Sequence, residues 1–494
     1  MATVPPLADI RGDAPPPGLA HALEAVRAVI GSRGSVDPGE TGGNVSFFRP
    51  RIVHAVVRPT RVDQVRRVVA LFDDPAVGCG LHPISTGRNW GLGSREPARD
   101  HVVTLDLAGL DRVREVNTEH GWAVVEPGVT QGRLAGCLTG TGRMLNVTAA
   151  SAHTSVVGNL LDRGVGVRRQ RTEDLAGLEV VLPDGELVHV GWWPEEGRAT
   201  AVYPPGLGPC PLQLFTQSDL GVITAAAVRL LPRPEAQRLI RLSFPRSGLT
   251  DAVEALRRFA AQGLVDGVIK VYDLVSAQFY GGRAGEFLAH VCVSGTAGSA
   301  EALAGIVIGE ATACGVFTEV VLSREPGGEP GDAVVNMLEG THRGDVGHND
   351  AMLEATLGQS AEHVDALGEG WLFFMPMVPF TGTAVSTAYG LLDRLHAETG
   401  RRPGCTVNGL GPDLVDFVVT FRFPRDAEAA EAAHRALDRA HELFAAHGFI
   451  PYRLDIDHAD WIGRLDPSPA ARDLTRRMKH WLDPHGAIAP GRYS

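Results

Sequence analysis

Three glycines within seven residues, Gly87, Gly91 and Gly93, mark the part of the sequence that points most directly to chemistry. They lie in the segment Ser85 to Ser94, which follows the strand-like residues 80–84. Glycine permits positive φ values, so the N–H groups of such a turn can point inward around a pyrophosphate. The segment is not a P-loop, because no Lys-Ser/Thr follows the last glycine, and it lacks the GxGxxG fingerprint. Alone, it predicts either a nucleotide cofactor or an ordinary turn.

Strand and helix patterns alternate around this segment, which indicates an α+β fold. The expected strands are residues 53–58, 102–105 and 122–126, and the expected helices are residues 19–30, 62–72 and 131–139. Residues 178–182 and 187–190 are expected to form a hairpin over Pro183-Asp184-Gly185. From Gln237 to Phe423 the pattern resembles βαβ units, with strands at 239–244, 268–272, 288–293, 371–375 and 417–423 and helices at 249–261 and 384–397. A further helix is expected over residues 427–446.

The chain length of 494 residues favours two domains over one. We expect an N-terminal extension (1–44), a first domain (45–235), a second domain (236–425) and a C-terminal segment (426–494). The stretch Gly327 to Ser360 is rich in Gly, Asp and His, and it predicts irregular surface structure or a lid.

The composition is that of a globular protein without a membrane-length apolar run, with 44% apolar and 21% charged residues. A net charge of −12 argues against a nucleic-acid partner. The first residues lack the basic start and apolar stretch of a signal peptide, so we expect a cytoplasmic protein with no membrane partner. The six cysteines form no CxxC pair, which favours reduced thiols over disulfides or a metal site, and we expect no metal.

Four separated segments fit one known pattern: Pro83 to Asn89, Val124 to Val129, Gly158 to Gly185, and Asp483 to Gly491. Their order and spacing resemble the FAD-binding fold of the vanillyl-alcohol oxidase and para-cresol methylhydroxylase family, in its 4-phenol oxidizing branch. The resemblance covers the chain from about Val53 onward. It implies an α+β fold with a two-part FAD-binding domain, a ferredoxin-like α+β cap over the flavin, and a C-terminal tail that returns to the flavin.

The same resemblance implies which residues bind FAD. Glycines and small hydroxyl residues let the backbone approach an extended anionic ligand closely, which agrees with this assignment. The expected cofactor-binding residues are Ser85, Thr86, Gly87, Arg88, Asn89, Trp90, Gly91, Pro127, Gly128, Thr154, Ser155, Gly158, Asn159, Gly164, Gly166, Ile223 and Arg492.

Tyr452 and Arg453 resemble the family's Tyr-Arg pair, which binds the substrate phenol as its phenolate. Arginine suits this role because it stays charged and offers several donors to an oxygen anion. Two other substrate positions depart from the family: Leu92 replaces a tyrosine, and Ala150 replaces the active-site aspartate. A phenolate loses a hydrogen bond to its charge, worth about 1.5–3 kcal/mol, when a tyrosine becomes leucine. We therefore expect a different substrate from a simple 4-alkylphenol.

The residue that carries covalent flavin in one branch of the family aligns with Val415 or Asp416, neither of which forms that bond, so we expect noncovalent FAD. His153 is a candidate for proton transfer, because imidazole titrates near neutral pH, or it makes a structural hydrogen bond. His342, His348 and Asp350 line the pocket from a lid, or form a solvated loop. The basic residues Arg168, Arg169 and Arg171 favour a surface or phosphate-side role over a substrate clamp.

These observations predict an FAD-dependent oxidoreductase that removes a hydride from an activated C–H of a medium-sized, aromatic or polycyclic molecule, as a tailoring oxidase in biosynthesis. Arg453, Tyr452 and His153 are the expected catalytic residues. One alternative is a 4-alkylphenol or vanillyl-alcohol type oxidase or dehydrogenase in aromatic degradation. Another is a flavin-fold cyclase or binding scaffold without redox turnover. The expected partners are a small-molecule substrate and, as electron acceptor, oxygen or an electron-transfer protein; the family also suggests a homodimer.

Overall fold

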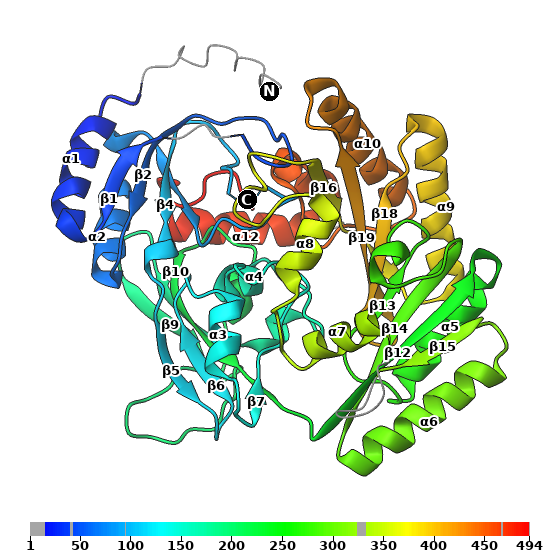
Figure 1. The fold of residues 1–494 in the computed structure, drawn as a ribbon. Coiled ribbons are helices and arrows are strands. Elements are labelled where there is room, and N and C mark those ends of the chain that lie inside the picture. Colours follow the sequence, from blue (N-terminus) through cyan, green and yellow to red (C-terminus); the bar gives the residue numbers. More distant parts are fainter. Residues whose placement is uncertain (1–14, 40–42, 94, 324–331, 466–467, 494) are drawn as a thin grey trace.

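The computed structural model describes residues 15–39, 43–93, 95–323, 332–465 and 468–493 (Figure 1). Ser94 of the glycine-rich segment and residues 327–331 of the expected lid lie outside these ranges, as do residues 1–14 and 40–42 of the expected extension. Two bodies stand side by side in Figure 1, one built from the first half of the chain and one mainly from residues 236–445. Within the described ranges, no helix has the length and apolar character needed to cross a membrane.

A four-stranded sheet and two helices form the outer part of the first domain. The sheet order is β1-β2-β4-β3, with β1 Ser35–Pro38, β2 Val53–Arg58, β4 Val102–Asp106 and β3 Gly80–Ile84. The helices are α1 Leu19–Ile30 and α2 Val62–Phe72. Val26 of α1 is fully buried, and β1 pairs with β2. Residues 19–38 therefore belong to this domain and are not the separate extension that the sequence suggested, because the apolar face of α1 needs a partner.

The inner part of the first domain is a five-stranded antiparallel sheet. Its order is β5-β6-β10-β8-β9, with β5 Val113–Asn117, β6 Trp122–Val125, β10 Val222–Arg229, β8 Leu175–Val181 and β9 Leu187–Gly191. The predicted hairpin joins β8 to β9, and Gly185 in its turn has a φ of +82°. Short helices α3 Gln131–Cys137 and α4 Val156–Leu161 and the strand pair β7 Arg143–Met144 and β11 Leu231–Pro232 complete this part.

The second domain is an eight-stranded antiparallel sheet backed by helices on one face. The strand order is β15-β12-β14-β13-β18-β19-β16, and β17 also pairs with β19. The strands are β12 Ala236–Pro245, β13 Ile269–Tyr272, β14 Glu286–Gly295, β15 Glu319–Leu322, β16 Gly370–Phe374, β17 Met377–Pro379, β18 Gly404–Gly409 and β19 Leu414–Phe423. The βαβ interpretation is wrong in direction, since every pair in this sheet is antiparallel.

The helices of this domain are α5 Leu249–Ala261, α6 Ala297–Ala313, α9 Gly382–Thr399 and α10 Ala427–Ala445, which Figure 1 shows on the outer side of the sheet. Their apolar residues, such as Leu256 and Leu392, share a core with Phe244 and Phe417 of the strands. Helix α10 also packs on α9, so it belongs to the cap and not to the C-terminal segment. Since this core covers one face, alternate residues of each strand face the first domain.

Two helices occupy the stretch for which the sequence predicted irregular structure or a lid. They are α7 Ala333–His342 and α8 Asn349–Leu357, and they lie between the two domains (Figure 1). Asp332 caps α7 by accepting hydrogen bonds from the N–H groups of Val334 and Val335. Glycine and aspartate in this stretch suggested a loop, but these residues fall at the helix ends and in the connection between them.

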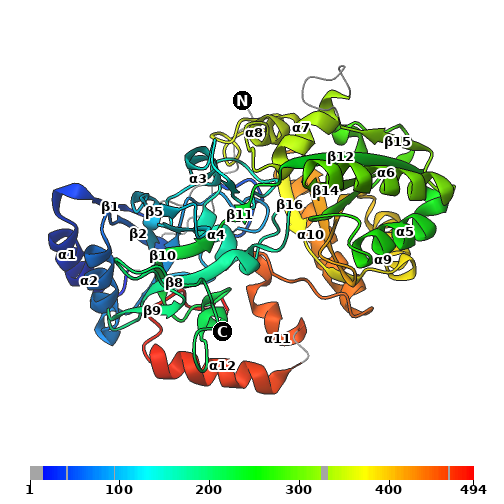
Figure 2. The same cartoon turned by 90° about the horizontal axis from the view of Figure 1, so that it is seen from below.

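The C-terminal tail returns to the first domain, as the resemblance implied. After α11 Ile462–Leu465, helix α12 Pro469–Leu482 runs along one side of the molecule (Figure 2). The N–H of Leu81 in β3 donates to the carbonyl of Ala487 (2.7 Å), and the N–H of Ala489 donates back to Leu81 (2.7 Å). The last residues are thereby held beside the glycine-rich segment that follows β3.

Candidate active site

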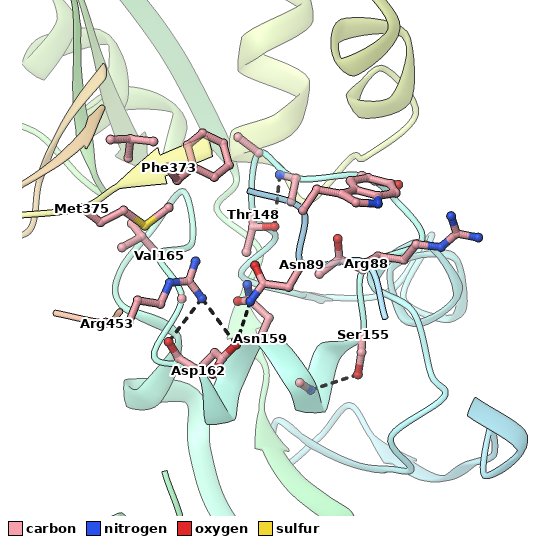
Figure 3. A pocket seen from close by; sticks show the side chains of 18 of the residues that line it. Arg88, Asn89, Thr148, Ser155, Asn159, Asp162, Val165, Phe373, Met375 and Arg453 are labelled. Atoms are coloured by element: carbon pink, nitrogen blue, oxygen red, sulfur yellow. Dashed lines mark hydrogen bonds and ion pairs between the residues drawn. The ribbon is translucent and has the colours of Figure 1, made fainter. Parts of the chain in front are cut away.

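A cavity of about 780 Å³ lies between the two domains. The first domain contributes the glycine-rich segment, α4 and the C-terminal tail, and the cap contributes the inner face of its sheet together with α7 and α8. Figure 3 shows side chains from these distant segments in one region: Asn89, Asn159 and Asp162 lie beside Arg453, and Phe373 and Met375 lie above it, while Arg88 points away. The cavity therefore has a cofactor-side wall and a cap-side wall.

Most of the residues expected to bind the cofactor line this cavity. They are Ser85, Thr86, Gly87, Arg88, Asn89, Trp90, Pro127, Thr154, Ser155, Gly158, Asn159, Gly164, Ile223 and Arg492. Gly91, Gly128 and Gly166 are not among the lining residues. A Cβ on Gly128 would lie 2.2 Å from the carbonyl oxygen of Ala108, and one on Gly91 would lie 2.4 Å from the ring of Phe373. These three glycines allow close packing with their neighbours.

The cofactor-side wall fits an extended anion that also offers hydrogen-bond donors. Thr154 Oγ1 and Asn159 Oδ1 are buried there and have no hydrogen-bond partner among the described residues. A Cβ on Gly158 would lie 2.5 Å from Ser85 Oγ, so a side chain at this position would fill the cradle. Ser155 holds the turn by accepting from the N–H of Gly158 (2.9 Å). Phosphate oxygens and hydroxyl groups, such as those of FAD, satisfy such orphaned polar atoms.

Asp162, at the end of α4, connects three of the converging segments. Its carboxylate accepts hydrogen bonds from Asn89 Nδ2 (2.8 Å) and from Tyr493 Oη (3.0 Å). Its Oδ2 also lies 3.7 Å from Arg453 Nη1, as the dashed lines in Figure 3 indicate. Asp162 therefore orients Arg453 from the first domain. Asp162 and Tyr493 were not predicted as site residues, because nothing in their local sequence distinguishes them from turn and tail residues.

Arg453 and Tyr452 both line the cavity, as expected. The guanidinium carbon of Arg453 lies 5.4 Å from the centre of the Tyr452 ring, and its Nε has no hydrogen-bond partner among the described residues. The Tyr452 hydroxyl donates to Met375 Sδ (3.3 Å), and burial raises the pKa of this hydroxyl, which stays neutral. Arg453 thus has donors left for an anionic ligand oxygen.

A row of polar side chains crosses the inner face of the cap sheet. In register, His290 on β14 lies opposite Lys270 on β13, Lys270 lies opposite Asn408 on β18, and Asn408 lies opposite Asp416 on β19. Directly opposed residues point to the same face of a sheet. Lys270 Nζ donates to Asn408 Oδ1 (3.0 Å), and Asn408 Nδ2 donates to Asp416 Oδ2 (3.1 Å). All four residues line the cavity.

The ionisable groups of this row are strongly perturbed by burial. Burial raises the pKa of Asp416 to about 6, and its Oδ1 has no hydrogen-bond partner among the described residues. Burial lowers the pKa of Lys270 to about 8. The pKa values of His290 and of His342 on α7 fall to about 3 for the same reason, so both rings are neutral. Asp416 is therefore a carboxylate poised to accept a proton near neutral pH.

The residues of this row were not predicted from the sequence as part of the site. Asp416 entered only as a position unable to carry covalent flavin, and Lys270 only as part of an expected strand. A usable signal was present for Lys270, since it is a single charged residue inside the buried strand of residues 268–272. The partnership of positions 270, 408 and 416 depends on strand pairing that the local sequence does not reveal.

Of the other residues that the sequence suggested, some line the cavity and some do not. His153 is absent from the cavity wall; its side chain is 58% exposed, and its Nε2 lies 3.9 Å from Asp350 Oδ2. Leu92 is only 2% exposed and also lies off the wall, because an apolar side chain packs inside the protein. Ala150 lines the cavity as expected, and its carbonyl accepts from Asn349 Nδ2 (2.6 Å). His342 and His348 line the cavity as well.

The three clustered arginines have structural partners. Arg168 Nη1 pairs with Asp266 (2.5 Å) and its Nε donates to the carbonyl of His342 (3.0 Å), which joins the first domain to the cap. Arg169 Nη2 pairs with Asp174 Oδ1 (2.8 Å), and the buried Arg171 donates to a backbone carbonyl. None of the three lines the cavity.

Comparison with known proteins agrees with this architecture. A family model described as an FAD binding domain matches residues 53–191. The 1'-carboxy-chondrochloren decarboxylase of Chondromyces crocatus is 28% identical over 539 aligned residues, covering 96% of this chain and 97% of that protein. The flavoprotein subunit of 4-cresol dehydrogenase (hydroxylating) from Pseudomonas putida is 33% identical over 209 residues, or 41% of this chain and 40% of the subunit.

Two solved structures share the fold along nearly the whole chain. The 4-ethylphenol oxidase from Gulosibacter chungangensis superposes with a TM-score of 0.83 at 21% identity, covering 97% of this chain and 99% of that one. The p-cresol methylhydroxylase with bound substrate gives a TM-score of 0.79 at 22% identity, covering 96% of each chain. The matched domain and the similarity to 4-cresol dehydrogenase support an FAD-dependent oxidoreductase, and the solved structures show that the chain has the fold of p-cresol methylhydroxylase.

Proposed function

We propose that this flavoprotein removes a hydride from an activated C–H of a medium-sized aromatic substrate that binds as an oxygen anion. The observation that carries the proposal is the juxtaposition, on one cavity wall, of Arg453 with unused donors and Asp416 with an unpartnered Oδ1. FAD, when bound along the cofactor-side wall, supplies the hydride acceptor. The chain's own residues bind the substrate, hold its charge and remove its proton.

Arg453 and Asp416 have complementary tasks in this proposal. The Arg453 guanidinium binds the anionic oxygen of the substrate, and such charge-assisted hydrogen bonds are about twice as strong as neutral ones. Asp162 orients that guanidinium from the other side. Asp416 Oδ1 accepts the proton of the substrate hydroxyl, since its pKa of about 6 leaves it ionised at pH 7 and still basic. The electron-rich anion then favours the loss of a hydride.

Several neutral side chains complete the binding site. Phe373 lies in β16, and Met375 is the first residue after that strand. Both line the cavity and lie near Arg453 in Figure 3. Their apolar surface suits an aromatic ring. Tyr452 stays neutral and is available as a hydrogen-bond donor to the substrate if it leaves Met375 Sδ. His153 stands as the alternative proton acceptor only if the surface around it rearranges, because it is exposed.

Ala150 and Leu92 supply neither the carboxylate nor the phenolic hydroxyl that the 4-phenol oxidizing enzymes use, so a simple 4-alkylphenol is the less favoured substrate. The full-length similarity to a decarboxylase favours a second candidate reaction, in which the substrate also loses a carboxylate. After a hydride leaves one carbon, the C–C bond to a carboxylate on the neighbouring carbon can break. Its electron pair then forms the new C=C bond, and CO₂ departs. A biosynthetic tailoring step suits either reaction.

An anaerobic titration of the FAD-loaded protein tests the proposal. The probes are 4-alkylphenols, a vanillyl alcohol and 4-hydroxyphenyl alkanoic acids, and the readout is the visible flavin band. Bleaching by any of these classes supports hydride removal, and trapping of released CO₂ distinguishes the decarboxylating reaction. A protein that binds these molecules but never bleaches is the flavin-fold scaffold without redox turnover. Exposure of the bleached protein to air then shows whether oxygen accepts the electrons.

We further propose that FAD is bound noncovalently. Position 416 holds an aspartate and position 415 a valine, and neither forms the flavin linkage. Acid precipitation of the yellow protein is expected to release the colour into the supernatant. A yellow pellet would contradict this expectation and direct attention to Tyr272 and Tyr280, tyrosines of the cap that line the cavity.

A further inference from the structure

Lys270 is an unusual residue for this chain. Among its 46 lysines and arginines, only Lys270 and Lys479 are lysines. Lys479 is fully engaged, since its Nζ donates to Asp483 Oδ2 (2.6 Å) and to the carbonyls of Asp219 (2.6 Å) and Ile488 (2.9 Å). Lys270 lines the cavity and lies on β13, a strand in the middle of the cap sheet (Figure 1). The Lys479 ammonium therefore has a full set of protein partners.

The Lys270 ammonium has one hydrogen bond within the described residues, to the amide oxygen Asn408 Oδ1 (3.0 Å). An ammonium group has three donors, so two remain unused. No carboxylate oxygen of the described chain lies within 4.0 Å of it. Burying a charge without a counter-charge is costly, and burial accordingly lowers the pKa of this group to about 8. A cost of this kind points to a ligand that supplies the missing anion.

Within the described chain, no group that faces Lys270 from a neighbouring element supplies an anion in contact with its ammonium. His290 on β14 and His342 on α7 are neutral, with pKa values lowered to about 3. Arg241 on β12 is paired with Asp332 (2.6 Å) and Glu319 (3.2 Å), so those two carboxylates are already committed. Asp416 on β19 is the nearest acid across the sheet, but Asn408 stands between it and Lys270. Asp416 thus acts on the Lys270 charge only from a distance, and no carboxylate of the described residues pairs with the ammonium directly.

The histidines add polar atoms that lack protein partners. Nε2 of His290 and Nε2 of His342 are buried and make no hydrogen bond within the described chain. Nδ1 of His342 lies 3.0 Å from the carbonyl of Leu338, so it carries the proton and leaves Nε2 as an acceptor. Neutral His290 donates from Nε2 in the tautomer that carries its proton on that nitrogen. A ligand group at Lys270 therefore meets an ammonium and a potential imidazole N–H donor.

We propose that Lys270 anchors a carboxylate of the substrate, so that the substrate of this flavoprotein is an aromatic carboxylic acid held at both ends. The inference rests on the proposed function, because it places the aromatic end of the substrate at Arg453. Lys270 and Asp416 lie two strands apart in the sheet, which corresponds to roughly 10 Å. A 4-hydroxyphenyl ring with a short acid side chain has about this span. One compact ammonium suits a singly charged carboxylate, whereas a phosphate dianion calls for more donors.

Calorimetric binding to the FAD-loaded full chain tests the anchor without turnover. The matched probes are 3-(4-hydroxyphenyl)propanoate and its uncharged amide. The wild-type protein is expected to bind the acid at least about tenfold more tightly than the amide, and Lys270→Met is expected to abolish that preference. Arg422→Met is the control: Arg422 lines the same cavity, but Glu369 already neutralises it (2.5 Å), so the preference is expected to persist.

The scarcity of lysine permits a second, spectroscopic readout. A chain labelled with ¹³C at lysine Cε has two lysine signals, and Lys270→Met identifies the one from Lys270. A carboxylate beside the ammonium favours its charged form, so the acid probe is expected to raise the pKa of Lys270 above about 8, whereas the amide leaves it unchanged. The preference for the acid is likewise expected to decline above pH 8, where the ligand-free ammonium loses its proton.

The outcomes separate this inference from the proposed function. Equal affinity for acid and amide, or a preference that survives in Lys270→Met, overturns the carboxylate anchor. If neutral phenols bleach the flavin while the acid shows no preference, the proposed function stands and the anchor fails. If the acid binds through Lys270 but no member of its class bleaches the flavin, the anchor stands and hydride removal fails.

Discussion

Arg453, Asp416 and Lys270 are charged residues of the cavity whose hydrogen-bonding groups are only partly used by the described residues. Asp162 pairs with Arg453 at 3.7 Å, which leaves the guanidinium able to bind a further anion. Asp416 has one oxygen hydrogen-bonded to Asn408 and one without a partner. Lys270 has a single neutral partner. In our account each incomplete set of contacts is completed by the substrate.

The first prediction concerns the stability cost of Lys270. Its folded pKa of about 8 lies below the ordinary 10.5, so the unfolded chain binds more protons between pH 8 and 10.5, and the free energy of unfolding rises with pH across that window. Below pH 8 the penalty is fully present. Lys270→Met is therefore expected to raise the free energy of unfolding at pH 7 by on the order of 3 kcal/mol, at about 1.4 kcal/mol per pKa unit.

Urea denaturation of both lysine variants measures this effect. Lys479→Met should act in the opposite direction, because it leaves the buried carboxylates Asp483 and Asp219 without their cation, and breaking such a buried pair costs about 3–5 kcal/mol. A loss of stability in Lys270→Met would mean that the ammonium has a strong protein partner, contrary to the account.

The second prediction concerns Arg453. A guanidinium offers a planar set of donors that an ammonium does not, so Arg453→Lys keeps the charge but loses part of the hydrogen bonding. Loss of one hydrogen bond to a charged group, worth about 1.5–3 kcal/mol, is expected to raise the Kd of a 4-hydroxyphenyl probe by about ten- to a hundredfold. Calorimetry measures the Kd, and an unchanged value would place the anionic oxygen elsewhere.

The family resemblance predicted residues that line the cofactor-side wall, whereas the polar row of the cap was not predicted. Gly158, Asn159 and Thr154 were predicted because short motifs of glycine and small polar residues bind anions. Leu92 and Ala150 stand where the resembling family has a tyrosine and an aspartate, and that they mark a different substrate stays a prediction. The polar row of the cap was not predicted, because Lys270 and Asp416 reach one cavity only through the pairing of strands far apart in the sequence.

At the scale of elements, the sequence predicted those helices and strands whose own residues show a clear apolar repeat or a turn signal. Helices α1 and α2 have the expected bounds, and the β8–β9 hairpin turns at the expected Pro183-Asp184-Gly185. Helices α7 and α8 were missed, because Gly340, Gly344 and Gly347 favour a loop and burial between the domains overrides that preference. Strand direction in the cap was also misjudged, since local pattern does not distinguish a βαβ unit from antiparallel strands joined through a helix.

The third prediction tests the cradle formed by α4 and the glycine-rich segment. In Gly158→Ala the new Cβ would lie 2.5 Å from Ser85 Oγ, which narrows the space for the cofactor. The variant is expected to be purified with less FAD, measured as visible flavin absorbance per protein. Gly136→Ala in α3 is the matched control, because its Cβ meets no atom within 4 Å and the variant should keep its FAD. Equal flavin content in the two variants would argue against the cradle.

The fourth prediction concerns the segment that follows Arg453. His458 Nδ1 lies 2.8 Å from Asp455 Oδ2, and its Nε2 lies 2.9 Å from Asp438 Oδ1 on α10. The two carboxylates raise the pKa of His458 to about 9, against burial, while His458 and His441 hold the pKa of Asp455 below its usual range. A raised histidine pKa contributes stability that is complete below pH 6.5 and is lost as the pH rises through 9.

Asp455→Asn is accordingly expected to lower the free energy of unfolding by on the order of 3 kcal/mol at pH 7, and by less at pH 10. Urea denaturation at the two pH values gives both numbers. Asp438→Asn is the milder comparison, because the Asp438 side chain is half exposed and water replaces part of its interaction. Equal losses at both pH values would show that the charge of His458 is not involved.

At the scale of the whole molecule, the two domains and the returning tail divide the work. The first domain and the tail form the cofactor-side wall, and the cap sheet presents its polar row to the same cavity. Length and motif order predicted this division, because the four segments of the cofactor domain include the C-terminal one. The exact boundaries were not predicted: α1 belongs to the first domain and α10 to the cap, since burial of their apolar faces decides membership.

The most direct test of the account is the rate of anaerobic flavin bleaching by 3-(4-hydroxyphenyl)propanoate as a function of pH, in the wild-type protein and in Asp416→Asn. Asp416 accepts a proton only when ionised, so the wild-type rate should fall as the pH drops through about 6. Asp416→Asn should be on the order of a hundredfold slower at pH 7 and should lack that dependence. Bleaching of Asp416→Asn at the wild-type rate, with the same pH profile, would contradict the account.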